Sequence, residues 1–240
     1  MVRLALAVFF LVSPLLAAGD ADLVRLLKGI EQRYNTAKSL QVQFNESYSV
    51  QGRPRQSESG TLTLRKPGRM RWDYSTPSGK LFLSDGKNLY LYTPQNRRVE
   101  RTKLKDSDDM RGPLAFLLGK LDFSREFRDF AWKPDGANYL LDARAQNDRL
   151  PYDKVEMLVT PQYEIRKLVV TNQDQSVLTF LFDGEKINPP VNETMFRFLM
   201  PEGAAFAGPE GAQAVGLAPL ENSKNEPRGT RFCASYLGAD

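Results

Sequence analysis

Few side chains in this sequence could take part in catalysis. The 240 residues include no His and a single Cys, Cys233, which lies in a tail rich in Gly, Ala and Pro. Without His, neither a Ser-His-Asp nor a Cys-His catalytic arrangement can form, and zinc loses a common ligand. Asp106, Asp108 and Asp109 bring carboxylates together, but they lack the spacing of a calcium-binding loop and are interpreted as a solvated loop. The sequence therefore predicts a protein that is not an enzyme and has no cofactor or metal.

One cation stands at an unusual position. In residues 60–66, Leu62 and Leu64 alternate with polar residues, and the same phase puts Lys66 on the apolar side. Either the ammonium group makes a specific contact there, or the long side chain carries it to solvent at the rim. A second group of cations is interpreted as a solvated loop rather than as a docking patch for an acidic partner. Its members are Arg97, Arg98, Arg101, Lys103 and Lys105.

Lys66 adjoins strands that bury one face. Along residues 69–74, large apolar side chains alternate with charged ones, which is the pattern of a half-buried strand. This aromatic face is either ordinary core or the lining of a space for an apolar ligand. Periodicity leaves open whether Leu89 and Leu91 or Tyr90 and Tyr92 face inward. The residues predicted for the inner face, which would line a lipid-binding cavity, are Phe44, Leu62, Leu64, Met70, Trp72, Tyr74, Leu81, Leu83, Tyr90 and Tyr92.

The remaining patterns predict a mainly β fold with few helices. Apolar residues at helical spacing predict an amphipathic helix over 22–37. Alternating segments separated by turn signals predict about ten antiparallel strands. The last of these carries Phe196, Phe198 and Met200. We expect one large, open, strongly curved antiparallel sheet or an incomplete barrel.

A short apolar segment, residues 113–121, interrupts the strands. Pro113 suits the first position of a helix, and Phe123, Phe127 and Phe130 extend the segment at helical spacing. The segment is too short to form a core of its own. We expect it to cover the open sheet as a lid, the alternative being a static core helix.

The two ends differ from the middle in composition. Residues 1–19 combine Arg3 with an apolar run and small residues, which predicts a cleaved signal peptide. Residues 20–206 are expected to form one domain, and 207–240 a disordered tail. The net charge of +4 is a small excess. It argues against a nucleic-acid partner, and we expect a monomer.

Taken in order, five sequence segments resemble one known family. They are LQVQF, GTLTLRKPGRMRWDY, LFLSDGKNLYLYTP, RGPLAFLLG and INPPVNETMFRFLMPEG. This order is similar to that of the periplasmic outer-membrane lipoprotein carrier protein of the Lol pathway, the LolA family, over residues 22 to 205. The resemblance implies a half-barrel closed by an N-terminal helix and a lid, in the periplasm of a Gram-negative-type bacterium. It implies a carrier that delivers acylated lipoproteins from the inner to the outer membrane.

The resemblance also implies partners and site roles. An inner-membrane ABC transporter would load the carrier, and an outer-membrane acceptor would unload it. Lys66 stands where the family has an Arg that holds the lid closed, and a Lys there is expected to give a looser latch. Met70 and Trp72 match cavity positions. The lid would consist of Leu114, Phe116, Leu117 and Leu118.

The sequence leaves two other functions open. A lipid-binding or stress-sensing domain of the envelope would have the same half-barrel and would recognise lipoproteins or glycolipids. A polysaccharide-binding or polysaccharide-acting protein would instead expose Trp72 and its Tyr neighbours in a solvent-filled groove.

Overall fold

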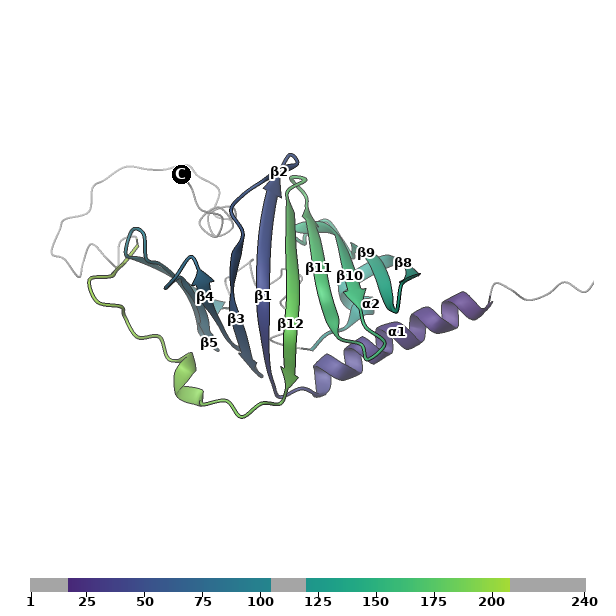
Figure 1. The fold of residues 1–240 in the computed structure, drawn as a ribbon, viewed down its shortest axis with the longest axis horizontal. Helices are drawn as coiled ribbons and strands as arrows, with labels where there is room; N and C mark the ends of the chain where they lie inside the picture. The colour runs from purple at the N-terminus through teal and green to yellow at the C-terminus, as the bar shows by residue number, and fades with distance from the viewer. Residues whose placement is uncertain (1–16, 105–119, 208–240) are drawn as a thin grey trace, which may run out of the picture.

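One long strand, β1 (Ser39–Val50), joins the two halves of the fold in the computed structural model, which describes residues 17–104 and 120–207. It pairs with β3 on one side and with β12 on the other, so the hairpins of both halves form one continuous sheet (Figure 1). The strand order is β13-β7-β6-β5-β4-β3-β1-β12-β11-β10-β9-β8, with β2 paired to β1 off this path. The described pairs are antiparallel except β13 with β7. The expected open, mainly β architecture is confirmed.

Most of the other strands follow one another along the chain as antiparallel hairpins. Helix α1 precedes β1, and α2 and η4 lie in two of the connections between strands. Asp85 stabilises one such hairpin, because its Oδ1 accepts hydrogen bonds from the amides of Lys87 and Asn88 at 2.7 Å each. The bounds are α1 Ala17–Thr36, β2 Arg53–Pro54, β3 Glu58–Arg65, β4 Arg69–Thr76, β5 Leu81–Asp85, β6 Asn88–Thr93, β7 Arg98–Lys103, α2 Phe123–Glu126, β8 Phe127–Asp135, β9 Asn138–Ala145, β10 Tyr152–Val159, β11 Ile165–Asn172, β12 Val177–Ile187, η4 Glu193–Phe196 and β13 Ala205–Phe206.

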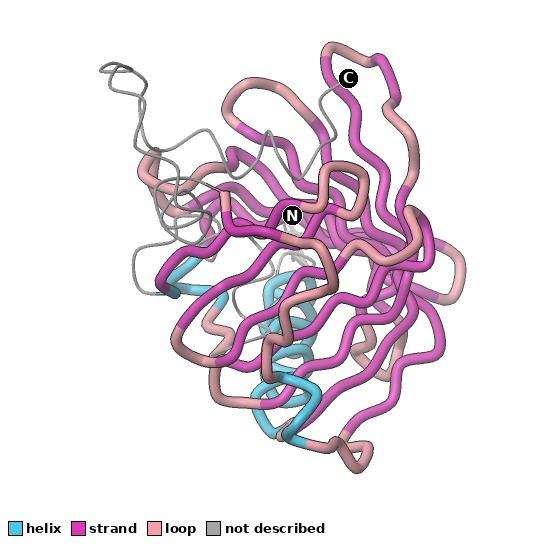
Figure 2. The backbone as a smooth tube through the Cα atoms, turned by 90° about the vertical axis from the view of Figure 1, so that its left-hand side faces the viewer, coloured by secondary structure: helices cyan, strands magenta, loops and turns pink. Residues whose placement is uncertain are grey.

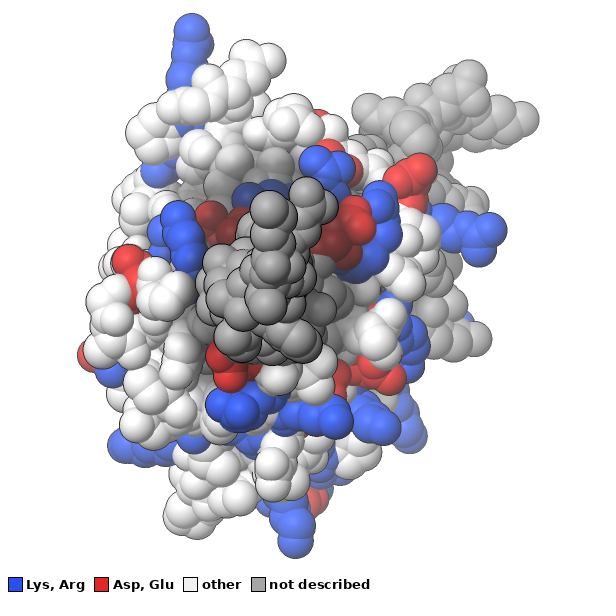
Figure 3. All heavy atoms as spheres, turned by 90° about the vertical axis from the view of Figure 1, so that its right-hand side faces the viewer, with Lys and Arg blue, Asp and Glu red and all other residues white. Residues whose placement is uncertain are grey.

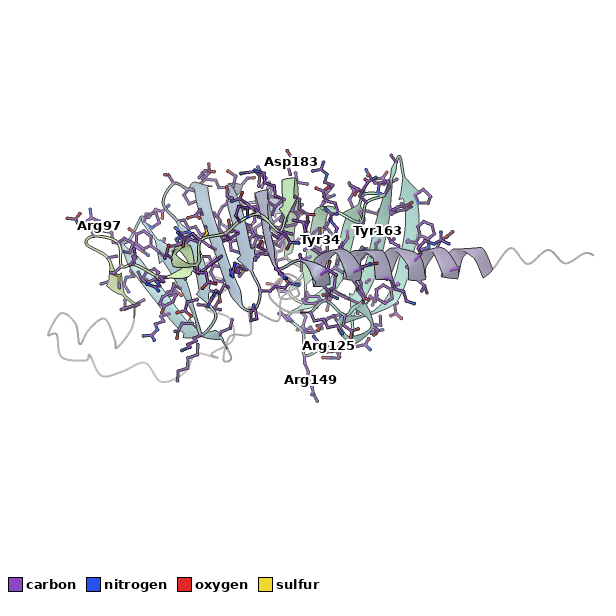
Figure 4. All side chains as sticks on the ribbon, turned by 90° about the horizontal axis from the view of Figure 1, so that it is seen from below. Tyr34, Arg97, Arg125, Arg149, Tyr163 and Asp183 are labelled. Carbon is purple, nitrogen blue, oxygen red and sulfur yellow. The ribbon has the colours of Figure 1, made fainter. Side chains whose placement is uncertain are left out.

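Helix α1 lies along one end of the strands in the second half of the sheet (Figures 1 and 4). The tube view shows it inside the curve of the sheet (Figure 2). Leu26, Ile30 and Tyr34 recur at helical spacing and are buried in the main core, which explains the predicted amphipathic helix. Among the described helices, none combines the length and apolar character needed to cross a membrane.

Three expectations about local structure are wrong. Residues 98–103 form strand β7 rather than a loop, because they pair in register with β6. Val99 is buried, and Arg101 on the same face lies over the ring of Tyr90. Phe127 and Phe130 lie in β8, not in a helix. A register shift between Arg128 and Ala131 gives the two rings a helix-like spacing of three. The expected strand at 196–200 is replaced by η4 and irregular chain.

Candidate functional site

The inner face of the sheet is apolar and aromatic over β1, β3 and β4. The ring of Phe44 meets Trp72 and Tyr74 edge-on, with centroids 4.6 and 5.1 Å apart. Trp72 is buried, in contrast to the exposed stacking surface that the polysaccharide alternative required. Six residues predicted for the inner face come together here: Phe44, Leu62, Leu64, Met70, Trp72 and Tyr74.

The expected placement of four other residues is wrong. Leu81, Leu83, Tyr90 and Tyr92 lie on the opposite, outer face, in a second and smaller apolar cluster. The register explains this, because Phe82 pairs with Trp72 and Ser84 pairs with Met70 on the inner face. Ser84 makes the inner face of β5 hard to recognise from the sequence, because a polar residue takes an inner position there. Its buried hydroxyl donates to the carbonyl of Gly68 at 2.5 Å. In the neighbouring strand, Leu89 and Leu91 join the inner core.

The C-terminal segment after β12 covers this outer cluster. It crosses back to the far end of the sheet, where β13 pairs with β7 (Figure 1). Phe198 stacks on Tyr90 with the ring centroids 4.4 Å apart. Arg71 donates to the carbonyl of Met195 at 2.9 Å, and Glu193 lies 2.8 Å from Arg65. These contacts place the outer tyrosines away from any ligand on the inner face.

Lys66 contacts the end of α1. Its Nζ donates to the carbonyl oxygen of Tyr34 at 2.7 Å, in the last turn of the helix. A cation is favourable at this position because the last carbonyls of a helix lack intrahelical partners and carry partial negative charge. Burial lowers the pKa of Lys66. A cleft of about 10 Å³, enough for roughly one water molecule, lies beside this contact.

The same helix end holds the chain that follows the predicted lid. Asn35 donates to the carbonyl of Leu121 at 2.8 Å and accepts from its amide at 2.7 Å. Glu31 accepts from the amide of Phe123 at 2.8 Å. The predicted lid residues Leu114, Phe116, Leu117 and Leu118 lie outside the described residues. Among the described residues, Lys66 is therefore linked to the lid region through α1.

Glu185 of β12 fixes α1 against the second half of the sheet. Its side chain accepts from Arg33 Nε at 2.9 Å and from the Tyr34 hydroxyl at 2.7 Å. The Tyr34 hydroxyl in turn accepts from the amide of Ile165 at 2.9 Å. Burial raises the pKa of Glu185, and the hydrogen bonds from Tyr34 and Arg33 oppose that shift. Figure 4 shows Tyr34 at the sheet end of α1, beside Tyr163.

A buried polar cluster that the sequence patterns did not single out lies farther along β1. Glu46 continues the inner phase of Leu40, Val42 and Phe44, and that alternation is the signal that could have identified it. It pairs in register with Glu58 of β3. Both Glu58 oxygens accept from Lys80 Nζ, at 2.7 and 2.6 Å. Lys80 Nζ lies 4.6 Å from the centre of the Tyr74 ring.

On the described part of the surface at the β8 end of the sheet, the charges do not form a second candidate site. On the face at the β8 end of the sheet, basic and acidic side chains are interspersed (Figure 3). Arg97 lies at the far left of the view in Figure 4, away from Tyr163. Among the described residues, no group of three His, Cys, Asp or Glu side chains is placed to hold a metal ion.

Comparison with known proteins identifies the family. The model described as outer membrane lipoprotein carrier protein LolA matches residues 35–199, more than half of the chain. This chain belongs to that family. The LolA match runs from the last turn of α1 past η4, and so it includes Lys66, Glu46 and the whole inner face. The periplasmic location expected from the sequence is confirmed.

Curated relatives match most of the chain. The outer-membrane lipoprotein carrier protein of Proteus mirabilis is 27% identical, over 72% of this chain and 84% of its own length. That of Cupriavidus necator is 28% identical, over 83% and 92%. Among solved structures, MucB is 14% identical with a TM-score of 0.45, over 80% of this chain and 65% of its own. A LolA superfamily protein from Nitrosomonas europaea is 10% identical with a TM-score of 0.42, over 73% and 97%.

Proposed function

We propose that this protein carries acylated lipoproteins from the inner to the outer membrane, holding their acyl chains against the inner face of the sheet. Membership of the LolA family supports the lipoprotein cargo. The observation that carries the proposal is an open sheet whose inner face gathers Phe44, Leu62, Met70 and Trp72 into one apolar surface.

The energetics require partners at both membranes. Burying each CH₂ group is worth about 0.8 kcal/mol relative to water, so an apolar face can shield acyl chains during transit. In the starting membrane, however, these chains already lie in hydrocarbon, and burial alone cannot extract them. We propose that an energy-consuming ABC transporter of the inner membrane loads the protein. An acceptor at the outer membrane with higher affinity for the cargo then unloads it.

The direct test is to identify what the protein retains. It is purified from periplasm without detergent, and the bound material is analysed by mass spectrometry. We expect acylated polypeptides. In a second step, adding the protein to inner-membrane vesicles with ATP should release lipoprotein into the soluble fraction. Retained glycans without any acylated protein, together with no ATP-dependent release, would contradict the carrier function.

Substituting Lys66 tests whether its contact with α1 serves transfer. Lys66→Leu removes the hydrogen bond to the Tyr34 carbonyl while keeping the aliphatic body of the side chain. We expect a folded protein whose free energy of unfolding falls by about 1 kcal/mol, the net value of one hydrogen bond. We expect transfer of bound lipoprotein to outer-membrane vesicles to slow several-fold, because α1 also holds Leu121 beyond the lid.

Lys38→Leu is the matched control for Lys66→Leu. Lys38 is exposed and lines the same cleft, so this variant loses one positive charge at the same place. Transfer by Lys38→Leu should equal that of the unmodified protein. If Lys66→Leu transfers equally well, Lys66 has no part in holding or releasing cargo.

A further inference from the structure

Two polar atoms on the inner face have no hydrogen-bond partner among the described residues. They are the indole Nε1 of Trp72 and Oε2 of Glu46. Both residues are buried, with exposed fractions of 2% and 3%. Leaving a buried polar atom without a partner costs free energy, and folded proteins contain few of them. Two such atoms close together on the inner face therefore point to a ligand that supplies their partners.

The two groups lie around the same pair of rings. Phe44 precedes Glu46 by two residues on the inner face of β1, and its ring centroid is 4.6 Å from that of Trp72. Phe180 of β12 is the cross-strand partner of Glu46, and its ring centroid is 5.7 Å from that of Trp72. The indole and the carboxyl group thus belong to one small region of the inner face, at β1, β4 and β12.

Glu46 is expected to keep its proton at neutral pH and so to be able to donate a hydrogen bond. Burial raises its pKa to about 8, and the negative charge of Glu58 contributes, while Lys80 and the hydrogen bond from Tyr74 oppose the shift. The Lys80 ammonium group is held by both Glu58 oxygens. Because Tyr74 hydrogen-bonds the carboxyl group and Oε2 has no partner among the described residues, we place the proton on Oε2. Both unpaired groups, N–H and O–H, are therefore donors.

Two unpaired donors without an unpaired acceptor select an uncharged ligand with acceptor oxygens. The ester carbonyls that join acyl chains to glycerol have this character. The distance from Glu46 to the α1 end of the sheet is long enough for an acyl chain. Glu46 lies six residues along β1 from Leu40, where α1 closes the end of the sheet. Six residues of strand span about 20 Å. One leaflet of acyl chains is about 15 Å deep, half of a bilayer core.

We propose that Trp72 Nε1 and the Glu46 carboxyl group bind the ester carbonyls of a diacylglyceryl group whose acyl chains extend toward α1. This inference rests on the proposed carrier function and adds the chemical group by which cargo is held. The polypeptide of the cargo would then leave at the end of the sheet away from α1, which lies along the other end (Figure 1).

A competition between ester and ether lipids tests the proposal. The full-length protein is mixed in detergent with equal amounts of dioleoyl glycerol and its dioleyl ether analogue, which lacks the carbonyl oxygens, and the detergent is then removed by dialysis, so that no membrane competes for the acyl chains. The protein is then separated, and its bound lipids are quantified by mass spectrometry. One hydrogen bond corresponds to about a two- to tenfold preference. We expect the bound ester-to-ether ratio to be at least threefold at pH 6.5 and to fall at pH 9, where Glu46 loses its proton.

Variants assign the preference to these two groups. Trp72→Phe and Glu46→Leu should lower the ratio toward one, while Glu46→Gln, which keeps an N–H donor, should retain part of it. Trp132→Phe is the matched control, because it removes the other indole of the chain, on β8 at the far edge of the sheet. Circular dichroism verifies that each variant is folded.

Each outcome is decisive. Lipid bound at a ratio near one, or a ratio that survives both Trp72→Phe and Glu46→Leu, overturns the ester contact and leaves the carrier function standing. In that case the two donors are hydrated by buried water only. Failure to retain either lipid overturns the ester contact together with the carrier function.

Discussion

The unmodified protein is expected to lose stability between pH 5 and pH 9, and Glu46→Gln is expected to lose much less. The pKa of Glu46 is raised from 4.5 to about 8 in the folded protein, chiefly by burial. Between these values the native state keeps a proton that the unfolded chain has released. The free energy of unfolding therefore falls as pH rises through this window, by on the order of 4 kcal/mol. Gln has no proton to lose, so Glu46→Gln should lack this contribution to the fall.

Urea unfolding at pH 5 and pH 9 provides the measurement. The quantity to compare is the change in unfolding free energy between the two pH values, in the unmodified protein and in Glu46→Gln. The exposed Glu202→Gln controls for the loss of one carboxylate. If the unmodified protein and Glu46→Gln lose stability equally between pH 5 and pH 9, Glu46 is not the group that titrates.

Gly60→Ala is expected to destabilise the protein by about 3 kcal/mol or more, near the upper end of overpacking effects. Gly60 lies on β3 between Phe44 of β1 and Tyr74 of β4. A Cβ atom at this position would collide with the backbone carbonyl of Asp73, which cannot rotate away. The β3–β4 register also shifts between Ser59 and Gly60. Relief of the clash would require the two strands to separate at the inner face.

Gly29→Ala is the matched comparison for Gly60→Ala. A Cβ atom on Gly29 of α1 would also overlap a neighbour, but that neighbour is the ring of Tyr163, which can turn aside. Ala also favours helix over Gly by about 1 kcal/mol, which offsets the cost of moving the ring. We expect a change in unfolding free energy within about 1 kcal/mol. Equal effects of the two substitutions in thermal or urea unfolding would show that backbone crowding at Gly60 is not the cause.

The inner face carries polar groups near both of its ends. Near α1, Lys66 binds the Tyr34 carbonyl, and Asn35 binds the chain at Leu121. Farther along, Glu46 Oε2 and Trp72 Nε1 lie between apolar rings without a hydrogen-bond partner among the described residues. An apolar surface between these two sites suits a ligand with a hydrocarbon body and an uncharged polar group at one end. This arrangement supports the proposed carrier function and the proposed ester contact.

Local sequence determined much of this protein. Period-two alternation predicted the half-buried strands around Leu62, Met70 and Trp72, because a strand between core and solvent must alternate. Helical spacing predicted α1 through Leu26 and Ile30. The order of the five segments along the chain was sufficient to indicate the LolA family. Alternation also put Lys66 on the apolar side, where it contacts α1.

Tertiary structure decided between alternatives that the local sequence patterns support equally well. Which face of β5 and β6 is inner depends on pairing with β4, because Leu83 and Phe82 are both apolar and only the Trp72–Phe82 register distinguishes them. The register shift in β8 gave Phe127 and Phe130 a spacing typical of a helix, because a bulge moves the alternation of a strand by one residue. The polar cluster at Glu46 could be recognised only from the tertiary structure, which brings Glu58, Lys80 and Tyr74 next to it. Periodicity places a residue on a face, whereas contacts between distant segments decide what that face meets.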